Sequence, residues 1–258
     1  MSTRAEQYEA VVVGRQQLSA HLVRLTLEVD GFVSTGIPDE WVGLVVPGQF
    51  QVRYYTVRSY TPGTIDLDVV VHDVGLVTEW ASGDCVGDTV VITEPKGSFA
   101  LPDGANWVML VGDLTAMPAM ARILESIDRP VRVWAEVADA ELRVDYLPDA
   151  AECTWLEPPA TGGSDLAAVV AALDWPTDPG YFWMAGESAS MRAIRKNLMR
   201  ERKLPPTDYD VMGYWRQASA RQPRAVDPGP IWRAGKAAGK SDEEIWANYD
   251  DAAQGVQS

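Results

Sequence analysis

The chain has few cysteines, few histidines and no long apolar run, and each of these scarcities excludes a class of protein. Its 258 residues include two cysteines, Cys85 and Cys153, and two histidines, His21 and His72. Two distant thiols make neither a disulfide framework nor a zinc ribbon. No apolar run approaches the roughly 20 residues that span a bilayer, and the first residues do not read as a secretory signal. We expect a cytoplasmic protein with no membrane insertion and no metal site of its own.

Positive charge is also scarce. The sequence has 22 Lys and Arg against 37 Asp and Glu, a formal net charge of −15. Binding to a nucleic-acid backbone depends on clustered cations, so we expect no nucleic-acid partner. An anionic small ligand would need a local basic pocket that works against a repulsive global field.

The first hundred residues read as short strands. Residues 21–29 and 64–72 alternate apolar and polar side chains, and residues 88–95 form a third candidate. Glycine and proline separate these runs, as at Pro62-Gly63. Repeated short strands with turn signals predict an antiparallel sandwich or barrel.

The pattern changes near residue 104. Buried-type strands are predicted at 107–113, 129–137, 180–187 and 208–215, and helices at 114–127, 165–173 and 188–202. We expect Thr115 to cap the first helix, with Pro118 in its first turn, and Ser188 or Ser190 to cap the third. Strands that alternate with helices predict a doubly wound parallel sheet.

A Gly/Pro-rich connector follows, and then a capping-box pattern of Ser241 and Glu244 predicts a tail helix.

The stretch "RYYTVRSY", residues 53–60, is unusual for a strand. Alternation places Arg53, Tyr55 and Val57 on one face, and neither face looks like core. Arg53 would pair with a phosphate, Tyr55 would stack on a flavin ring, and Thr56 would hydrogen-bond flavin N5. The alternative is an ordinary polar strand at a sheet edge.

Three loops repeat a turn followed by a helix start, at residues 72–81, 111–120 and 185–195. A helix start after a glycine-containing turn binds anions readily, although each of these is also a common connecting loop. There is no GxGxxG fingerprint, and "GESAS" is not the GxSxG elbow of a hydrolase.

Six motifs in order connect these features. They are "RYYTVR", "HDVGLVTEWASG", "EPKGSF", "GDLTAMPAMARILE", "WMAGESASMRAIRKNL" and "GYWR". Together they closely resemble the siderophore-interacting proteins, which are flavin-dependent ferric-siderophore reductases of the ferredoxin-reductase-like superfamily. The resemblance implies three parts: an antiparallel six-stranded FAD-binding β-barrel (1–102), a doubly wound parallel-sheet α/β domain for the nicotinamide nucleotide (103–217), and a connector with a tail helix (218–258).

The resemblance also implies roles for particular residues. Thr56, at flavin N5, and Asp113 would be the catalytic residues. Contacts to NAD(P)H would come from Gly186, Glu187 and Ser188. Contacts to FAD would come from Arg53, Tyr55, Thr56, Val57, His72, Gly75, Thr78, Asp113, Thr115, Ala116 and Trp215.

Two positions depart from the family pattern. Leu76 stands where the family usually has proline, which would have fixed φ in the turn. Leu114 stands where the family usually has an acid, and this change bears on the choice of reductant.

The implied reaction passes a hydride from a nicotinamide to FAD and then single electrons to Fe(III). Hard-oxygen chelators hold Fe(II) far less tightly, so reduction releases the metal for iron acquisition. Lys96 matches a basic family position and is a candidate contact to an anionic chelate. Arg233, Lys236 and Lys240 are further candidates, and the alternative for all four is a solvated surface charge.

The electron donor is open at this point. Glu136 at a strand end favours the free ribose hydroxyl of NADH, whereas Arg143 nearby would meet the 2′-phosphate of NADPH. A ferredoxin donor is a third alternative. Two other functions compete: a flavin reductase with another acceptor, and a non-catalytic carrier of siderophore or flavin.

Overall fold

The computed structural model describes residues 6–49, 51–72, 75–148 and 152–217. The chain divides into one compact unit, Met1–Arg216, and a second, Gln217–Ser258. Within the described ranges, no helix is long and apolar enough to cross a membrane. The expected tail helix, together with Arg233, Lys236 and Lys240, lies outside the described residues.

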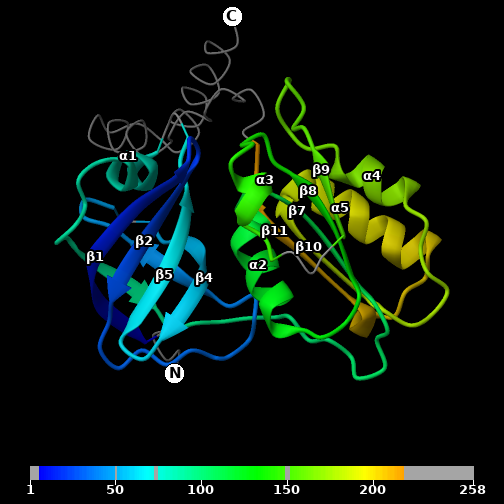
Figure 1. The fold of residues 1–258 in the computed structure, drawn as a ribbon, viewed down its shortest axis with the longest axis horizontal. Coiled ribbons are helices and arrows are strands. Elements are labelled where there is room, and N and C mark those ends of the chain that lie inside the picture. Colours follow the sequence, from blue (N-terminus) through cyan, green and yellow to red (C-terminus); the bar gives the residue numbers. More distant parts are fainter. Residues whose placement is uncertain (1–5, 50, 73–74, 149–151, 218–258) are drawn as a thin grey trace, which may run out of the picture. The chain divides into compact units, whose positions relative to one another are not determined.

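Six antiparallel strands close into a barrel in the order β1-β2-β5-β4-β3-β6 (Figure 1). Their bounds are β1 (Gln7–Ser19), β2 (Leu22–Glu28), β3 (Trp41–Val45), β4 (Arg53–Thr61), β5 (Thr64–Val70) and β6 (Thr89–Thr93). On β2 the alternation puts Val23, Leu25 and Leu27 in the barrel core. The helix α1 (Leu76–Ser82) packs Val77 and Ala81 against the same core. The six-stranded barrel is therefore confirmed.

Five parallel strands form the second sheet, in the order β11-β10-β7-β8-β9. They are β7 (Val108–Asp113), β8 (Val131–Glu136), β9 (Glu152–Leu156), β10 (Tyr181–Glu187) and β11 (Tyr209–Trp215). The helices are α2 (Met117–Ser126), α3 (Leu142–Asp145), α4 (Leu166–Ala172) and α5 (Ser188–Lys196). Two 3₁₀ turns lie at η1 (Leu114–Ala116) and η3 (Pro206–Asp208), and a π-helical segment, η2 (Asn197–Glu201), continues α5.

Helices cover both faces of this sheet (Figure 1). Leu110 of β7 belongs to the cluster that contains α2 and α3 residues, whereas Met109 and Val111 belong to the cluster with α4 and α5 residues. Alternate side chains of a fully buried strand thus pack on opposite helix layers. The doubly wound prediction is confirmed.

Three strands, β1, β3 and β9, were not predicted from the sequence. β1 hides its alternation because register shifts interrupt its pairing with β2 near Gly14 and because Val11 and Val13 are exposed. β9 lies at the edge of the sheet and has half-buried rather than buried side chains, so its apolar signal is weak.

The expected helix caps were wrong in detail. The carboxylate of Asp113, not Thr115, caps η1 by accepting the backbone N–H of Thr115. Similarly, Glu187 caps α5 by accepting the N–H groups of Ala189 and Ser190. In both cases the acid that ends the strand, just before the expected hydroxyl, is the cap, and its negative charge suits the positive helix start.

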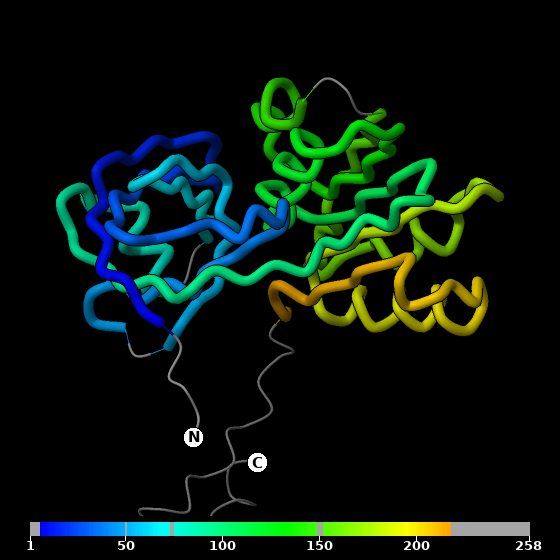
Figure 2. The backbone as a smooth tube through the Cα atoms, turned by 90° about the horizontal axis from the view of Figure 1, so that it is seen from below, coloured from blue at the N-terminus to red at the C-terminus, as the bar shows by residue number. Residues whose placement is uncertain are grey.

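The segment from β6 to β7 runs from the barrel to the parallel sheet (Figure 2). It is anchored by Asp39, whose buried carboxylate accepts the N–H groups of Ser98 and Phe99, both at 2.9 Å. The same carboxylate accepts Trp183 Nε1 of β10 at 3.2 Å. Asp39 therefore ties the barrel, the connecting segment and the sheet together.

Candidate functional site

One face of β4 belongs to the barrel, contrary to the expectation that neither face is core. Val57 is fully buried in the barrel core, and Tyr55 packs against that core. Burial raises the pKa of Tyr55 to about 12, and nearby Arg53 opposes this shift. The backbone of Val57 is also committed, because its N–H donates to Glu40 O at 2.9 Å and its carbonyl accepts Arg122 Nη1 at 2.7 Å.

The start of β4 carries two exposed side chains, Arg53 and Tyr54. The Arg53 guanidinium is exposed and donates to the side chain of Gln51 at 3.0 Å. Tyr54 is 68% exposed. An exposed arginine can pair with a phosphate and an exposed tyrosine can stack on a ring, but these two consecutive side chains lie on opposite faces of the strand. The sequence interpretation gives the stacking role to Tyr55, which is partly buried against the barrel core, and the adjacent Tyr54 is the more exposed of the two.

Thr56 lies where β4 meets the parallel sheet. Its side chain is 5% exposed. The Tyr214 hydroxyl of β11 is buried without a hydrogen-bond partner of ordinary geometry. Burial raises the pKa of this phenol, the charge of Asp39 adds to the effect, and the neighbouring Thr56 hydroxyl partly offsets it. Tyr214 is a buried residue beside Thr56 that the sequence interpretation did not name.

His72, Gly75 and Thr78 come together at the start of α1. Gly75 has φ of +146°, a conformation that favours glycine, and a Cβ there would lie 3.5 Å from the His72 ring and 3.8 Å from Thr78 Oγ1. His72 is exposed and Thr78 is buried. Leu76, at the position where the family usually has proline, is 44% exposed.

Asp113 is the centre of a cluster at the carboxyl ends of β7, β10 and β11. Its Oδ1 accepts both the N–H and the hydroxyl of Thr115, and its Oδ2 accepts Trp215 Nε1 at 2.6 Å. Burial raises the pKa of Asp113, and these hydrogen bonds lower it in part. A Cβ on Gly186 would lie 2.5 Å from Asp113 Oδ2, so only glycine allows this approach.

The neighbouring candidates have well-defined places. Glu187 is buried as the cap of α5, and Ser188 Oγ donates to Trp215 O at 2.6 Å. Ala116 is fully buried, and a Cβ added to Gly112 would lie 2.4 Å from the Cβ of Ala116. The side chain of Ala116 therefore packs against β7. The sequence-predicted residues of the α/β domain thus meet at one sheet edge.

Lys96 is less integrated. Its side chain is 62% exposed, and its ammonium lies 3.6 Å from Glu94 Oε1. The described residues contain no group of three or more His, Cys, Asp or Glu that could hold a metal ion.

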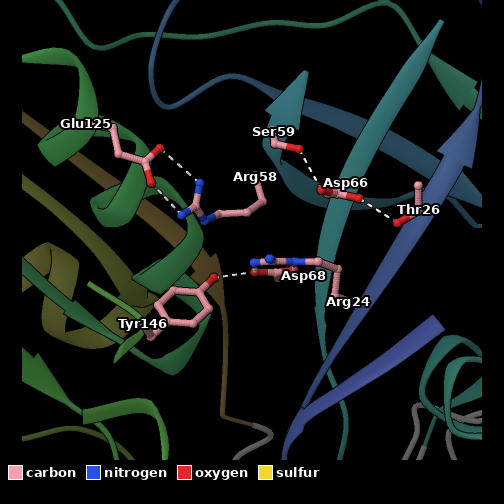
Figure 3. Close-up of polar contacts among 8 residues, drawn as sticks. All are labelled: Arg24, Thr26, Arg58, Ser59, Asp66, Asp68, Glu125 and Tyr146. Atoms are coloured by element: carbon pink, nitrogen blue, oxygen red, sulfur yellow. Dashed lines mark hydrogen bonds and ion pairs between the residues drawn. The ribbon is translucent and has the colours of Figure 1, made fainter. Parts of the chain in front are cut away.

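Polar contacts join the barrel to the α/β domain, and none of them was predicted. Asp68 of β5 pairs with Arg24 of β2 through two bonds of 2.7 and 2.8 Å, and it also accepts the hydroxyl of Tyr146 (Figure 3). Arg58 pairs with Glu125 of α2 at 2.6 Å. The pairing of β4 with β5 shifts register between Val57 and Ser59, and the side chain of Arg58 between them points toward Glu125 of α2. Such irregularities commonly redirect a side chain.

Helix α2 makes a further connection. Arg122 bonds the carbonyl of Val57 and pairs with the buried carboxylate of Glu40 at 3.0 Å. Residues this far apart in sequence show no spacing signal, so only the fold reveals them.

FAD fits these residues. The exposed guanidinium of Arg53, held only by Gln51, suits a diphosphate, and the ring of Tyr55 on the same face of β4 suits stacking on a ring system. The glycine-built turn at Gly75 and the unpartnered hydroxyl of Tyr214 are further features that a bound group would use.

Two family models match the chain in succession. Residues 48–99 match the siderophore-interacting FAD-binding domain, and residues 105–218 match the siderophore-interacting protein model.

Three curated relatives illustrate the range of similarity. The mycobactin import ATP-binding/permease protein IrtA of Mycolicibacterium smegmatis is 26% identical over 84% of this chain, which spans 26% of IrtA. The ferric vibriobactin reductase ViuB of Vibrio cholerae is 31% identical, with 64% of each chain covered. The NADPH-dependent ferric-chelate reductase of Escherichia coli is 26% identical over 61% of this chain and 65% of its own length. The chain therefore spans less than two thirds of each of these relatives.

A solved structure agrees with them. The siderophore utilization protein from T. fusca is 28% identical and superposes with a TM-score of 0.71, covering 84% of this chain and 94% of its own. Since both halves of the described fold match models of one family, in the family's order, the chain belongs to the siderophore-interacting protein family.

Proposed function

We propose that this chain is a flavin-dependent reductase that uses NAD(P)H to reduce a ferric siderophore and so releases Fe(II). The observation that carries the proposal is the meeting of two sets of candidate residues. Thr56 on the barrel strand lies beside Tyr214 of β11, whose neighbour Trp215 is bonded to Asp113 at the sheet edge.

The barrel residues would hold the cofactor. Arg53 would pair with the diphosphate, Tyr55 would stack on the ring, and the turn of His72, Gly75 and Thr78 would receive the remaining phosphate and adenine side. FAD, when bound, accepts a hydride and returns single electrons. Thr56 would contact the reacting edge, where its buried position excludes water.

The residues of the sheet edge would orient the nicotinamide. Asp113 holds Trp215 and Thr115 in place, and Gly186 lets β10 pass close to its carboxylate. Ser188 fixes the backbone of Trp215. These contacts place an indole and a glycine-lined backbone at the point where open parallel sheets bind ligands.

The substrate, the electron donor and the cellular compartment complete the proposed reaction. Lys96 would contact an anionic chelate, and its single weak pairing with Glu94 leaves it available. Arg233, Lys236 and Lys240 would add positive charge near the chelate. A ferredoxin is the alternative donor, and the reaction would take place in the cytoplasm.

The test is an anaerobic absorbance scan of the purified protein, before and after NADH or NADPH and then after a ferric siderophore. The proposal predicts a flavin spectrum that bleaches with a nicotinamide nucleotide and returns with the iron chelate. A flavin spectrum that ignores both nucleotides would point to a ferredoxin donor or a carrier. Bleaching without reoxidation by ferric chelates would point to another acceptor. A colourless protein that takes up no FAD would overturn the proposal.

A further inference from the structure

The stretch of the α/β domain from β8 to the residue after β9 is acidic. Residues 133–157 contain seven Asp and Glu and a single cation, Arg143. The phosphate monoester that distinguishes NADPH from NADH carries a charge of about −2 at neutral pH. A binding region for NADPH would therefore need Arg143 free.

The place of the adenosine end follows from the topology. The strand order β11-β10-β7-β8-β9 reverses direction between β7 and β10, and ligands of such sheets bind beyond the carboxyl ends of the strands at that point. The adenosine ribose then lies beyond the neighbouring strands, here the ends of β8 and β9. Glu136 ends β8, and Glu157 directly follows β9.

Glu136 is already occupied. Its side chain is buried, and Oε1 accepts the N–H of Asp165 at 2.8 Å in the turn before α4. Burial raises the pKa of Glu136, and the bond from Asp165 opposes this shift. The residue thus positions a turn and is not presented to a ribose hydroxyl.

Arg143 is occupied as well. Its Nε donates to Val137 O at 3.0 Å, and its Nη2 donates to the same carbonyl and to Glu157 Oε1, the latter at 2.5 Å. The Arg143 side chain is 24% exposed, whereas that of Glu157 is 72% exposed. The solvent side of the pair is therefore its negative partner.

We propose that the Arg143–Glu157 pair makes this chain prefer NADH to NADPH, an inference that rests on the proposed function. Glu157 neutralises the one cation of this region and meets a 2′-phosphate with like charge, which is specificity by repulsion. NADH has a neutral hydroxyl at that position and meets no such penalty. This preference would differ from the E. coli relative, whose name gives NADPH as its donor.

The experiment compares three variants of the FAD-loaded full chain. Glu157→Gln removes the repelling charge and releases Arg143. Glu157→Gln combined with Arg143→Gln removes the released cation too. Glu152→Gln is the matched control, because Glu152 is an exposed acid at the opposite end of the same strand.

Two readouts are used. Calorimetry gives the dissociation constants of NAD⁺ and NADP⁺, and anaerobic stopped-flow absorbance gives the rate of flavin reduction by NADH and NADPH, with no iron acceptor present. We expect the unaltered chain to favour NADH by at least about tenfold. Glu157→Gln should tighten NADP⁺ and speed NADPH about tenfold, as a freed guanidinium pairs with the phosphate. The double variant should lose most of that gain, and Glu152→Gln should change neither nucleotide more than about twofold.

Several results would overturn the inference: a preference for NADPH in the unaltered chain, equal effects of Glu157→Gln and Glu152→Gln, or no binding of either nucleotide. Failure of the proposed function looks different. If NADH reduces the flavin but ferric siderophores do not reoxidise it, the acceptor is wrong while the donor preference stands.

Discussion

Asp39 offers the most direct test of how the barrel is held to the sheet. Its carboxylate is fully buried and accepts four hydrogen bonds, from Ser98 N, Ser98 Oγ, Phe99 N and Trp183 Nε1. Asp39→Ala leaves the donors of Phe99 and Trp183 buried without an acceptor, whereas exposed Ser98 can turn to water. Each buried unsatisfied donor costs about 1–3 kcal/mol, so we expect Asp39→Ala to lower the free energy of unfolding by about 4 kcal/mol.

Asp39→Asn sharpens the test. Its one amide oxygen can keep the two backbone donors, but its NH₂ then faces Trp183 Nε1, so one buried donor is lost and the cost should be about 2 kcal/mol. Urea unfolding, followed by tryptophan fluorescence, gives the free energy of unfolding of both variants from the shift in the midpoint, provided that the dependence on urea concentration keeps the same slope. Asp103→Ala, an exposed acid in the same connecting segment, is the control. If Asp39→Ala were no more destabilising than Asp103→Ala, or Asp39→Asn as costly as Asp39→Ala, the account of this anchor would be refuted.

Three further predictions concern the cofactor, the substrate and pH. Arg53→Ala should give largely colourless protein, because the exposed guanidinium is the proposed partner of the diphosphate, and stoichiometric FAD in the purified variant would contradict this. Lys96→Glu should slow turnover of an anionic ferric chelate more than that of a neutral one, and equal effects would remove Lys96 from the site. Burial alone would raise the pKa of Asp139, but hydrogen bonds from Ser19 and His21 outweigh it and lower that pKa below 3.8. The ionised carboxylate of Asp139 therefore stabilises the folded state above about pH 4, and this stabilisation is lost as the pH falls through the folded-state pKa. In urea unfolding, Asp139→Asn should lower the free energy of unfolding fully at about pH 6 and by less below about pH 4. A loss of free energy that does not depend on pH would contradict this prediction.

Regular patterns in the sequence predicted much of the fold. Alternation in β2 and β5 and the strand–helix succession after residue 104 were sufficient for a barrel and a doubly wound sheet. Local motifs also located Asp113, Gly186 and Trp215, because residues at the carboxyl ends of parallel strands gather at one edge.

The sequence was insufficient where tertiary contacts decide. Alternation could not show that Val57 faces the barrel core, because the residues that share its face, Arg53, Tyr55 and Ser59, carry polar groups. Asp39 and Trp183 lie 144 positions apart, so their bond has no local signature.

The contacts of α2 have a consequence for protein engineering. The sequence places the joint between the two parts near residue 102, where a chimera with a relative would naturally be cut. Arg122, however, serves the barrel from the far side of that joint, through the carbonyl of Val57 and the carboxylate of Glu40. A graft made at residue 102 would separate Glu40 from Arg122 and Asp39 from Trp183, although Asp39 would keep its bonds from Ser98 and Phe99. An interchangeable module therefore has to carry α2 and Trp183 along with the barrel.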